Sequence, residues 1–568
     1  MAHSRGHVAS SCLRRTLSAA TIVSSGEKFA GGVRRLAAGL VEYGIGVGDV
    51  VAVAALNSDE YIELFLAVTY IGAIVAPLNH RWSFEEARSA MELVQPTMLA
   101  VDGSCFSWAV ELRKSTFLPS LALYLLLGDH SPARSSFGSF LTVDNIKSSS
   151  RGMITLEPSW APKDIALICF TSGTTGRPKG AAISHTSLIV QSLAKIAIVG
   201  YGEDDVYLHA APLCHIGGIS SCIAMLMVGA RHVLLPKFDA ESAFKAIKER
   251  KVTSFIAVPA MMADLVSYSR RVSELEGVET VTKILNGGGG LSEELVEGAS
   301  RLFPRATILS AYGMTEACSS LTFMTLRNPT LQKPRELLQS KYVIRSELHC
   351  PKQEGVCVGK AAPHVELRIS GDQNSNSNSN SNSSYGSRLV GKILTRGLHV
   401  MVGYWDRSEA ILLDSIEHGW LDTGDIGWID GDGDLWLMGR EKGRIKSGGE
   451  NVYPEEVEAV LAQHPGIAKA VVVGAPDVRL TEKVVACVIT KDEWSWVGRK
   501  SNHSESGKEL SAEILQRHCR ERNLSRFKIP KSYVVWKKPF PVTTTGKIRR
   551  EDVKRKVTSC MMHLPSNL

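Results

Sequence analysis

The segment at residues 171–180, TSGTTGRPKG, constrains the fold of this chain more than any other stretch. It directly follows the apolar run IALICF at residues 165–170, which is typical of a buried parallel strand. A glycine-rich loop after such a strand lies at the carboxyl edge of a sheet, where α/β proteins bind ligands. Its glycines, its hydroxyl groups and the charge of Lys179 together predict a loop that binds phosphate. Pro178 and Gly180 distinguish it from a P-loop, and a flexible loop without chemical function is the alternative.

Length and composition narrow the class of protein. The chain has 568 residues, 44% of them hydrophobic, which is enough for two or more packed domains. Its net charge of +7 is spread along the sequence, so we expect no nucleic-acid partner. None of the 11 cysteines forms a CxxC pair, which favours reduced thiols in an intracellular compartment over a disulfide framework or a zinc site. No apolar run is long enough to cross a bilayer, so we expect no transmembrane segment.

Helical and strand patterns alternate along most of the chain. Residues 27–43 and 60–71 have apolar side chains at helical spacing, whereas residues 50–56 and 73–77 are short apolar runs typical of strands. The alternation continues past the phosphate loop, where we expect a helix at residues 184–197 with a serine as its N-cap. The pattern predicts an α/β fold.

The two ends and one insert have distinctive compositions. Residues 1–26 lack acidic side chains and contain arginines among serines and alanines, similar to a transit peptide. Residues 566–568, Ser-Asn-Leu, resemble the Ser-Lys-Leu peroxisomal signal. We therefore expect an organellar protein, in the chloroplast and/or the peroxisome, with a cytoplasmic location as the alternative. The Asn-Ser repeat at about residues 373–385 cannot bury apolar surface and is expected to be a disordered surface loop.

Two further segments place useful groups at the ends of expected strands. The segment at residues 284–291 is ILNGGGGL. Its four glycines have no side chains, so a flat ring can pack directly against the backbone. ILSAYGMTE at residues 308–316 ends with Tyr312, Thr315 and Glu316. A carboxylate in this place suits a hard cation that bridges phosphate groups.

Three more polar residues are candidates for a binding site. WLDTGDI at residues 420–426 places Asp425 at a sheet edge, where a carboxylate can accept hydrogen bonds from both ribose hydroxyls. Arg440 follows in a basic, glycine-bounded segment and suits ribose or phosphate, and a surface ion pair is the alternative for both. His215 comes after a strand in the turn PLCHIGG at residues 212–218, although a lone histidine is more often structural.

These motifs, in this order, resemble those of the adenylate-forming superfamily, which includes acyl-CoA synthetases, firefly-type luciferases and adenylation domains. The resemblance implies a large N-terminal domain of several subdomains at residues 27–441. It also implies a smaller, mobile α+β lid domain at residues 442–568, with Lys442 as the hinge. The implied reaction joins a small carboxylic acid to CoA, with ATP and Mg²⁺, through an acyl-AMP intermediate.

The same resemblance assigns roles to individual residues. Glu316 is the implied ligand of Mg²⁺. The implied catalytic residues are Lys547, Lys179, His215 and Thr315, and the implied CoA contacts are Gly448 and Gly449. The implied ATP contacts are Thr171, Ser172, Gly173, Thr174, Thr175, Gly176, Lys179, Gly287, Gly288, Gly289, Tyr312, Gly313, Thr315, Asp425, Arg440 and Lys547.

A closer resemblance concerns the substrate. The flanks VAPLNHRWSFEEA, IKSGGENVYPEEVEAVL and FPVTTTGKIRR resemble the plant 2-succinylbenzoate–CoA ligases of phylloquinone (naphthoquinone) biosynthesis. A medium-chain fatty acyl or 4-coumarate-type CoA ligase is the alternative, and a non-catalytic nucleotide-binding paralogue is a second. A diacid requires a cation for its second carboxylate, and Arg231, Lys237 and His215 all remain candidates. The sequence makes no prediction of the oligomeric state.

Overall fold

The structure, a computed structural model, describes the backbone of residues 7–10, 22–114, 117–128, 140–149, 157–172, 178–272, 275–330, 356–370, 389–406, 416–417, 419–440, 443–497, 508–541 and 548–562. Several predicted features lie outside these residues: Gly173, Thr174, Thr175 and Gly176 of the phosphate loop, Lys442, Lys547, the Asn-Ser repeat, most of residues 1–26 and the last three residues. The side chains of Ser172 and Arg440 are likewise not described.

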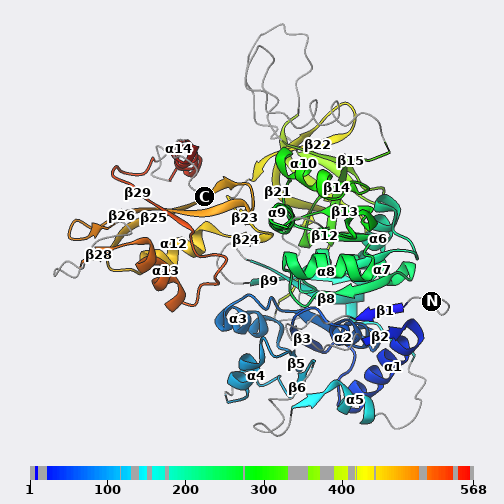
Figure 1. The fold of residues 1–568 in the computed structure, drawn as a ribbon. Helices are drawn as coiled ribbons and strands as arrows, with labels where there is room; N and C mark the ends of the chain where they lie inside the picture. The colour runs from blue at the N-terminus through cyan, green and yellow to red at the C-terminus, as the bar shows by residue number, and fades with distance from the viewer. Residues whose placement is uncertain are drawn as a thin grey trace. The chain divides into compact units, whose positions relative to one another are not determined.

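The chain divides into two compact units (Figure 1). The first contains Met1–His80, Ala90–Phe170 and Gly180–Glu441, and the second contains Arg81–Ser89, Thr171–Lys179 and Lys442–Leu568. Helices and strands alternate through most of the first unit, which confirms the predicted α/β class.

The larger sheet of the first unit has 14 strands, and its central strands are parallel and buried. The connecting helices lie beside these strands (Figure 1). Polar N-caps start two of the helices, since Asp239 and Ser292 accept hydrogen bonds from backbone N–H groups. The parallel part consists of β10 (Val206–His209), α7 (Ile216–Val228), β11 (Arg231–Leu234), α8 (Ala240–Arg250), β12 (Ser254–Ala257), α9 (Pro259–Ser269), η3 (Val278–Thr280), β13 (Lys283–Asn286), α10 (Glu293–Leu302) and β14 (Thr307–Met314).

The same sheet becomes antiparallel after β14. The short helix η4 (Thr315–Ala317) turns the chain back, and the following strands extend the sheet on one side: β15 (Ser319–Arg327), β16 (Val356–Ala361), β22 (Asp434–Arg440), β21 (Trp420–Ile429), β18 (Gly391–Arg396), β17 (Glu366–Ser370) and β20 (Ile416–Glu417). On the other side, β11 is followed by β1 (His7–Ser10) and β2 (Ile22–Ser25). The end of β14 is therefore the place where the parallel and antiparallel parts of the sheet meet.

A second sheet has 8 strands. The order of its strands and the helices between them along the chain agrees closely with the alternation of helices and strands predicted from the sequence. Its strands, in order, are β19 (Gly403–Tyr404), β9 (Pro178–Ser184), β8 (Ile165–Ser172), β4 (Ile74–Pro77), β3 (Val50–Ala54), β5 (Met98–Val101), β6 (Leu123–Leu126) and β7 (Leu141–Thr142). The neighbouring helical segments in the chain are α1 (Gly26–Glu42), α2 (Asp59–Tyr70), α3 (Phe84–Val94), α4 (Phe106–Arg113), α5 (Val143–Ser149), η1 (Pro162–Asp164), α6 (His185–Lys195) and η2 (Ile196–Gly200). Ser184 caps α6 as predicted.

The second unit contains a 5-stranded sheet with its own apolar core. Its strands are β23 (Ile445–Ser447), β24 (Glu450–Val452), β25 (Ile467–Asp477), β26 (Thr481–Thr490) and β29 (Ser532–Val535), with a separate pair β27 (Ser495–Trp496) and β28 (Glu509–Leu510). Its helices are α12 (Pro454–Ala462), α13 (Ala512–Glu521) and α14 (Arg550–Met562). This composition confirms the predicted α+β character of the smaller domain.

Two further observations concern the expectations from composition. In the part of the chain that the structure describes, no helix combines the length and the apolar character that a bilayer crossing requires. Cys105, Cys169, Cys214, Cys222, Cys318, Cys357, Cys487 and Cys519 are free and buried.

Gly39 and Gly31 both lie in α1, but only Gly31 has room for a side chain. A Cβ at Gly39 would lie 2.0 Å from the backbone oxygen of Ile146, whereas a Cβ at Gly31 would meet only Arg35 Nη1, at 3.8 Å. We expect Gly39→Ala to lower the free energy of unfolding by about 1–3 kcal/mol through steric strain. Gly31→Ala should raise it by about 0.5–1 kcal/mol through helix propensity. Urea unfolding followed by circular dichroism measures both, and equal effects would contradict the close contact of α1 with α5.

Candidate active site

The turn between β14 and β15 gathers several of the predicted site residues. Gly313 lies beside the backbone of β15, and a Cβ there would lie 1.6 Å from the backbone oxygen of Ser319. Only glycine permits this approach. The turn places Tyr312 just before the contact, and Thr315 and Glu316 just after it in η4.

Tyr312 and Asp425 meet although they are 113 residues apart in the sequence. The Tyr312 hydroxyl donates a hydrogen bond of 2.7 Å to Asp425 Oδ2, and both side chains are buried. The prediction that Asp425 lies at a sheet edge is wrong, because β21 lies between β18 and β22 and pairs with both. The backbone of Asp425 pairs with that of Arg440 at the end of β22. The two predicted ribose or phosphate contacts are therefore neighbours across adjacent strands.

Glu316 is a buried carboxylate with one oxygen that accepts a hydrogen bond and one that has no partner among the described residues. Tyr404 donates its hydroxyl to Oε1 at 2.8 Å. The other oxygen, Oε2, is buried and has no hydrogen-bond partner among the described residues. An oriented carboxylate with an oxygen left over fits a hard divalent cation, so Glu316 could hold Mg²⁺ with Tyr404 fixing its orientation.

His215 ends a turn, as predicted, since its backbone N–H donates a hydrogen bond of 3.2 Å to the backbone oxygen of Pro212, and it is also the N-cap residue of α7. The two glycines that follow are in the first turn of that helix. A Cβ at Gly218 would lie 2.3 Å from the backbone oxygen of Pro212, so the close approach of the preceding loop requires glycine there. The half-buried His215 is thereby held at the start of α7.

The glycine-rich loop after β13 lies close to the side chain of Ile256 in β12. Asn286 Nδ2 donates 2.7 Å to the backbone oxygen of Gly289, and Gly288 has a positive φ of 75°, which together define the turn. A Cβ at Gly287 would meet only Ile256 Cδ1, at 3.9 Å, and a Cβ at Gly217 of α7 would meet the same methyl group at 3.8 Å. Both glycines are half-buried. Two glycines, one from α7 and one from the loop after β13, therefore approach the same methyl group.

Lys195 is a buried cation that sequence reasoning missed. It ends α6 and is fully buried, with Nζ against the hydroxyls of Ser220 and Ser221 in α7. Gln191 and Ser192, one turn earlier, are also fully buried. A polar stripe at helical spacing was the available signal, but such a stripe is more often a solvated face.

Two buried thiols lie close to these groups. Burial, with a further contribution from Glu316, raises the pKa of the Cys169 thiol in β8 to about 12. Burial also raises the pKa of Cys318, which follows η4. Both cysteines therefore remain protonated at neutral pH.

The remaining described candidates belong to the second unit. Thr171 is buried near the end of β8, and Lys179 is exposed near the start of β9. Gly448 and Gly449 form the turn between β23 and β24, with positive φ values of 60° and 86° that favour glycine.

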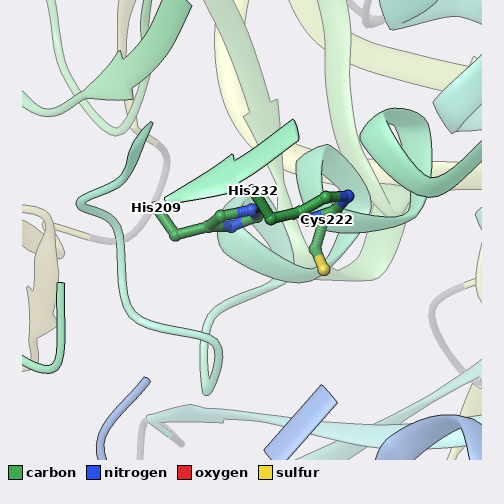
Figure 2. Close-up of side chains that lie close together, drawn as sticks. All are labelled: His209, Cys222 and His232. Atoms are coloured by element: carbon green, nitrogen blue, oxygen red, sulfur yellow. Dashed lines mark hydrogen bonds between the residues drawn. The ribbon is translucent and has the colours of Figure 1, made fainter. Parts of the chain in front are cut away.

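His209, Cys222 and His232 form a buried cluster on β10, α7 and β11 (Figure 2). Their possible ligand atoms all lie within 4.8 Å of one another. However, His209 Nε2 and His232 Nδ1 are 2.9 Å apart and already form a hydrogen bond. Burial lowers the pKa of both rings, that of His232 to about 4, and raises the pKa of the Cys222 thiol to about 12. The two rings are neutral and already bond to each other, although His232 Nε2 has no hydrogen-bond partner among the described residues. We assign the cluster a packing role.

Comparison with known proteins agrees with this geometry. Residues 22–405 match the AMP-binding enzyme family, and residues 456–547 match the AMP-binding enzyme C-terminal domain. The chain is 50% identical to the 2-succinylbenzoate–CoA ligase, chloroplastic/peroxisomal, of Arabidopsis thaliana over the full length of both. It is 32% identical to an indoleacetate–CoA ligase of Aromatoleum aromaticum, over 93% of this chain and 92% of that one.

A solved structure resembles the chain over almost its whole length. The o-succinylbenzoate CoA synthetase of Bacillus subtilis, a double mutant bound to a product analogue, matches with a TM-score of 0.71 and 25% sequence identity, covering 97% of this chain and 96% of that one. Family, relatives and fold all agree with the motifs. The chain therefore belongs to the AMP-binding enzymes, the adenylate-forming superfamily that its motifs indicated.

Proposed function

We propose that this protein is an ATP-dependent acid–CoA ligase that converts 2-succinylbenzoate to its CoA thioester in phylloquinone biosynthesis. The observation that carries the choice of acid is the identity of 50% to the Arabidopsis 2-succinylbenzoate–CoA ligase over the whole of both chains. The name of that relative also supports an organellar location, in the chloroplast and/or the peroxisome.

The described residues support the first half of such a reaction. Asp425, held by Tyr312, provides a carboxylate for the ribose hydroxyls of ATP, with Arg440 on the adjacent strand. Thr315 and Glu316 follow in η4, at the end of the same strand that carries Tyr312. Bound at Glu316, Mg²⁺ would neutralise charge on the phosphates as pyrophosphate leaves.

The region beside Ile256 is our candidate for the acyl-binding site. It is bordered by Gly217 of α7 and by Gly287 after β13, and His215 lies at the start of α7. Gly288 and Gly289 continue the loop and leave its backbone bare for a flat group. The acid would lie here with its carboxylate directed to the α-phosphate of ATP.

Two lysines complete the proposed mechanism. Lys179 and Lys547 stabilise negative charge while the carboxylate attacks the α-phosphate to give acyl-AMP and pyrophosphate. With Lys442 as a hinge, the domain at residues 442–568 then withdraws Lys547, so that the CoA thiol can displace AMP. Gly448 and Gly449 are the proposed contacts of the pantetheine arm.

The proposed function is tested by measuring CoA-dependent release of AMP with 2-succinylbenzoate, hexanoate, 4-coumarate and indoleacetate. We expect kcat/KM to be highest for 2-succinylbenzoate. A preference for one of the other acids would agree with acid–CoA ligation but contradict the proposal that 2-succinylbenzoate is the substrate. Nucleotide binding without AMP release on any acid would support a non-catalytic paralogue.

Lys547→Ala should affect the two half-reactions unequally. We expect the rate of adenylation, measured by pyrophosphate exchange, to fall by about 10²–10³-fold, the effect of losing one preorganised electrostatic contact. Thioester formation from supplied acyl-AMP should change by less than about threefold if the lysine acts only in the first half-reaction. The neighbouring lysine Lys537, substituted in the same way, serves as the control. Equal losses in both half-reactions would argue against separate roles.

Tyr404→Phe removes the hydroxyl that orients Glu316. Because groups that orient metal ligands typically contribute tenfold or more to metal affinity, we expect the Mg²⁺ concentration for half-maximal activity to rise about tenfold. The rate at saturating Mg²⁺ should change little. Tyr124→Phe, at a tyrosine of β6, is the matched control. An unchanged Mg²⁺ titration of Tyr404→Phe would rule out the orienting role.

A further inference from the structure

Lys195 is a buried cation that has only neutral partners. Its side chain is 0% exposed. Nζ lies 2.7 Å from Ser220 Oγ, 3.1 Å from Ser221 Oγ and 3.5 Å from the backbone oxygen of Gly217. In the described ranges, no carboxylate forms an ion pair with this ammonium. Burial of an ammonium without a counter-charge is unfavourable, so a ligand that brings a negative charge would stabilise it.

The ammonium lies behind Gly217, a glycine that we place beside the proposed acyl site. The backbone oxygen of Gly217 faces Lys195 Nζ, and a Cβ at Gly217 would meet Ile256 Cδ1. Gly217 is half-buried, whereas Ser220 and Ser221 are fully buried. A group bound over Gly217 is therefore close to the ammonium but separated from bulk water.

The cations considered from the sequence are less suitable. Arg231 lies at the start of β11 and Lys237 follows that strand, and both are exposed to solvent. An exposed cation is already hydrated and gains little from a carboxylate. Lys195 gains more because burial has removed water from it.

We propose that Lys195 pairs with the second carboxylate of a dicarboxylic acid, the one that is not activated, and so determines the preference of the enzyme for a diacid. The inference rests on the proposed function, since it concerns the substrate of the same site. Lys195 is a substrate-binding residue in this scheme and takes no part in the transfer of the acyl group.

The charge of Lys195 should respond to the ligand. Burial lowers the pKa of Lys195 to about 7, and Cys318 is the titratable group that interacts with it, with a thiol pKa that burial raises. In the free enzyme the amine therefore loses its proton as the pH rises above about 7. A carboxylate beside it favours the charged form and raises its pKa, so binding of the diacid includes uptake of a proton above that pH.

Lys195→Met tests the pairing because methionine keeps the length of the side chain without the charge. The substrates are 2-succinylbenzoate and its two analogues that each lack one carboxylate, 4-oxo-4-phenylbutanoate and 2-butanoylbenzoate. For the diacid we expect kcat/KM to fall by about 100-fold, mainly through KM, as for the loss of one partner of a buried charge pair. For whichever of the two analogues the enzyme still activates, Lys195→Met should change kcat/KM by less than about threefold.

The variant should fold, since both serines keep other acceptors. Ser220 Oγ donates to the backbone oxygen of Ile216, and Ser221 Oγ donates to that of Gly217. Lys283→Met is the matched control, because Lys283 already pairs with Asp205 at 2.7 Å. It should alter stability without altering the preference between the acids.

A pH profile gives a second readout that a purely structural role would not move. In the wild type, the ratio of kcat/KM for the diacid to that for the analogue should decrease by up to about tenfold per pH unit above the pKa of the free enzyme. In Lys195→Met the ratio should be flat. If the wild type is active on the diacid and Lys195→Met still prefers the diacid over the analogue, the inference about Lys195 is overturned but the proposed function stands. A wild type inactive on the diacid would overturn the proposed function as well.

Discussion

The contact between two backbones at Gly313 is the constraint on which the candidate site depends. The chain reverses there from the last parallel strand, β14, into the antiparallel strand β15, and no other residue has room at this point. Cys318 takes a left-handed conformation, with φ of 52°, to complete the turn. Because the turn is so tight, Tyr312 and Glu316 stay close to the end of the strand, where α/β proteins bind their ligands.

The buried polar groups around this turn share one design. Asp425 receives the hydroxyl of Tyr312, and Glu316 receives the hydroxyl of Tyr404, so that each carboxylate is oriented by a tyrosine from another strand. Desolvated carboxylates are unfavourable in isolation, and the tyrosines offset part of that cost. Oε2 of Glu316 has no hydrogen-bond partner among the described residues. The site is therefore preorganised for cations and hydroxyl groups before any ligand binds.

Much of the fold was predictable, because short apolar runs between helical patterns are a strong local signal. Strand β4 has the bounds expected from the apolar run at residues 73–77 to within one residue, and α1 begins within a residue of its prediction. Tyr312, Thr315 and Glu316 were predictable because they end an apolar strand. The placement of Asp425 was wrong because a strand does not reveal its neighbours, and β22 returns beside β21.

The errors at α6 and α7 have a related physical cause. The two glycines expected to end the turn at His215 instead lie in the first turn of α7, and one of them is required by the backbone of Pro212, which no local pattern encodes. Lys195 has the sequence of a solvated helix position. It is buried only because α7, which supplies its partners 25 and 26 residues later, packs over it. Tertiary contacts of this kind decide function but leave no trace in a short window.

The state of the buried thiols has a consequence for the chemistry of an acyl-adenylate. Such a mixed anhydride is designed to be attacked by a thiol, and a thiolate of the enzyme itself would compete with CoA for it. Cys169, whose pKa responds to Glu316, and Cys318, next to η4, are both kept protonated by burial. Burial of Cys169 and Cys318 therefore keeps these two thiols from competing with CoA for the acyl-adenylate intermediate.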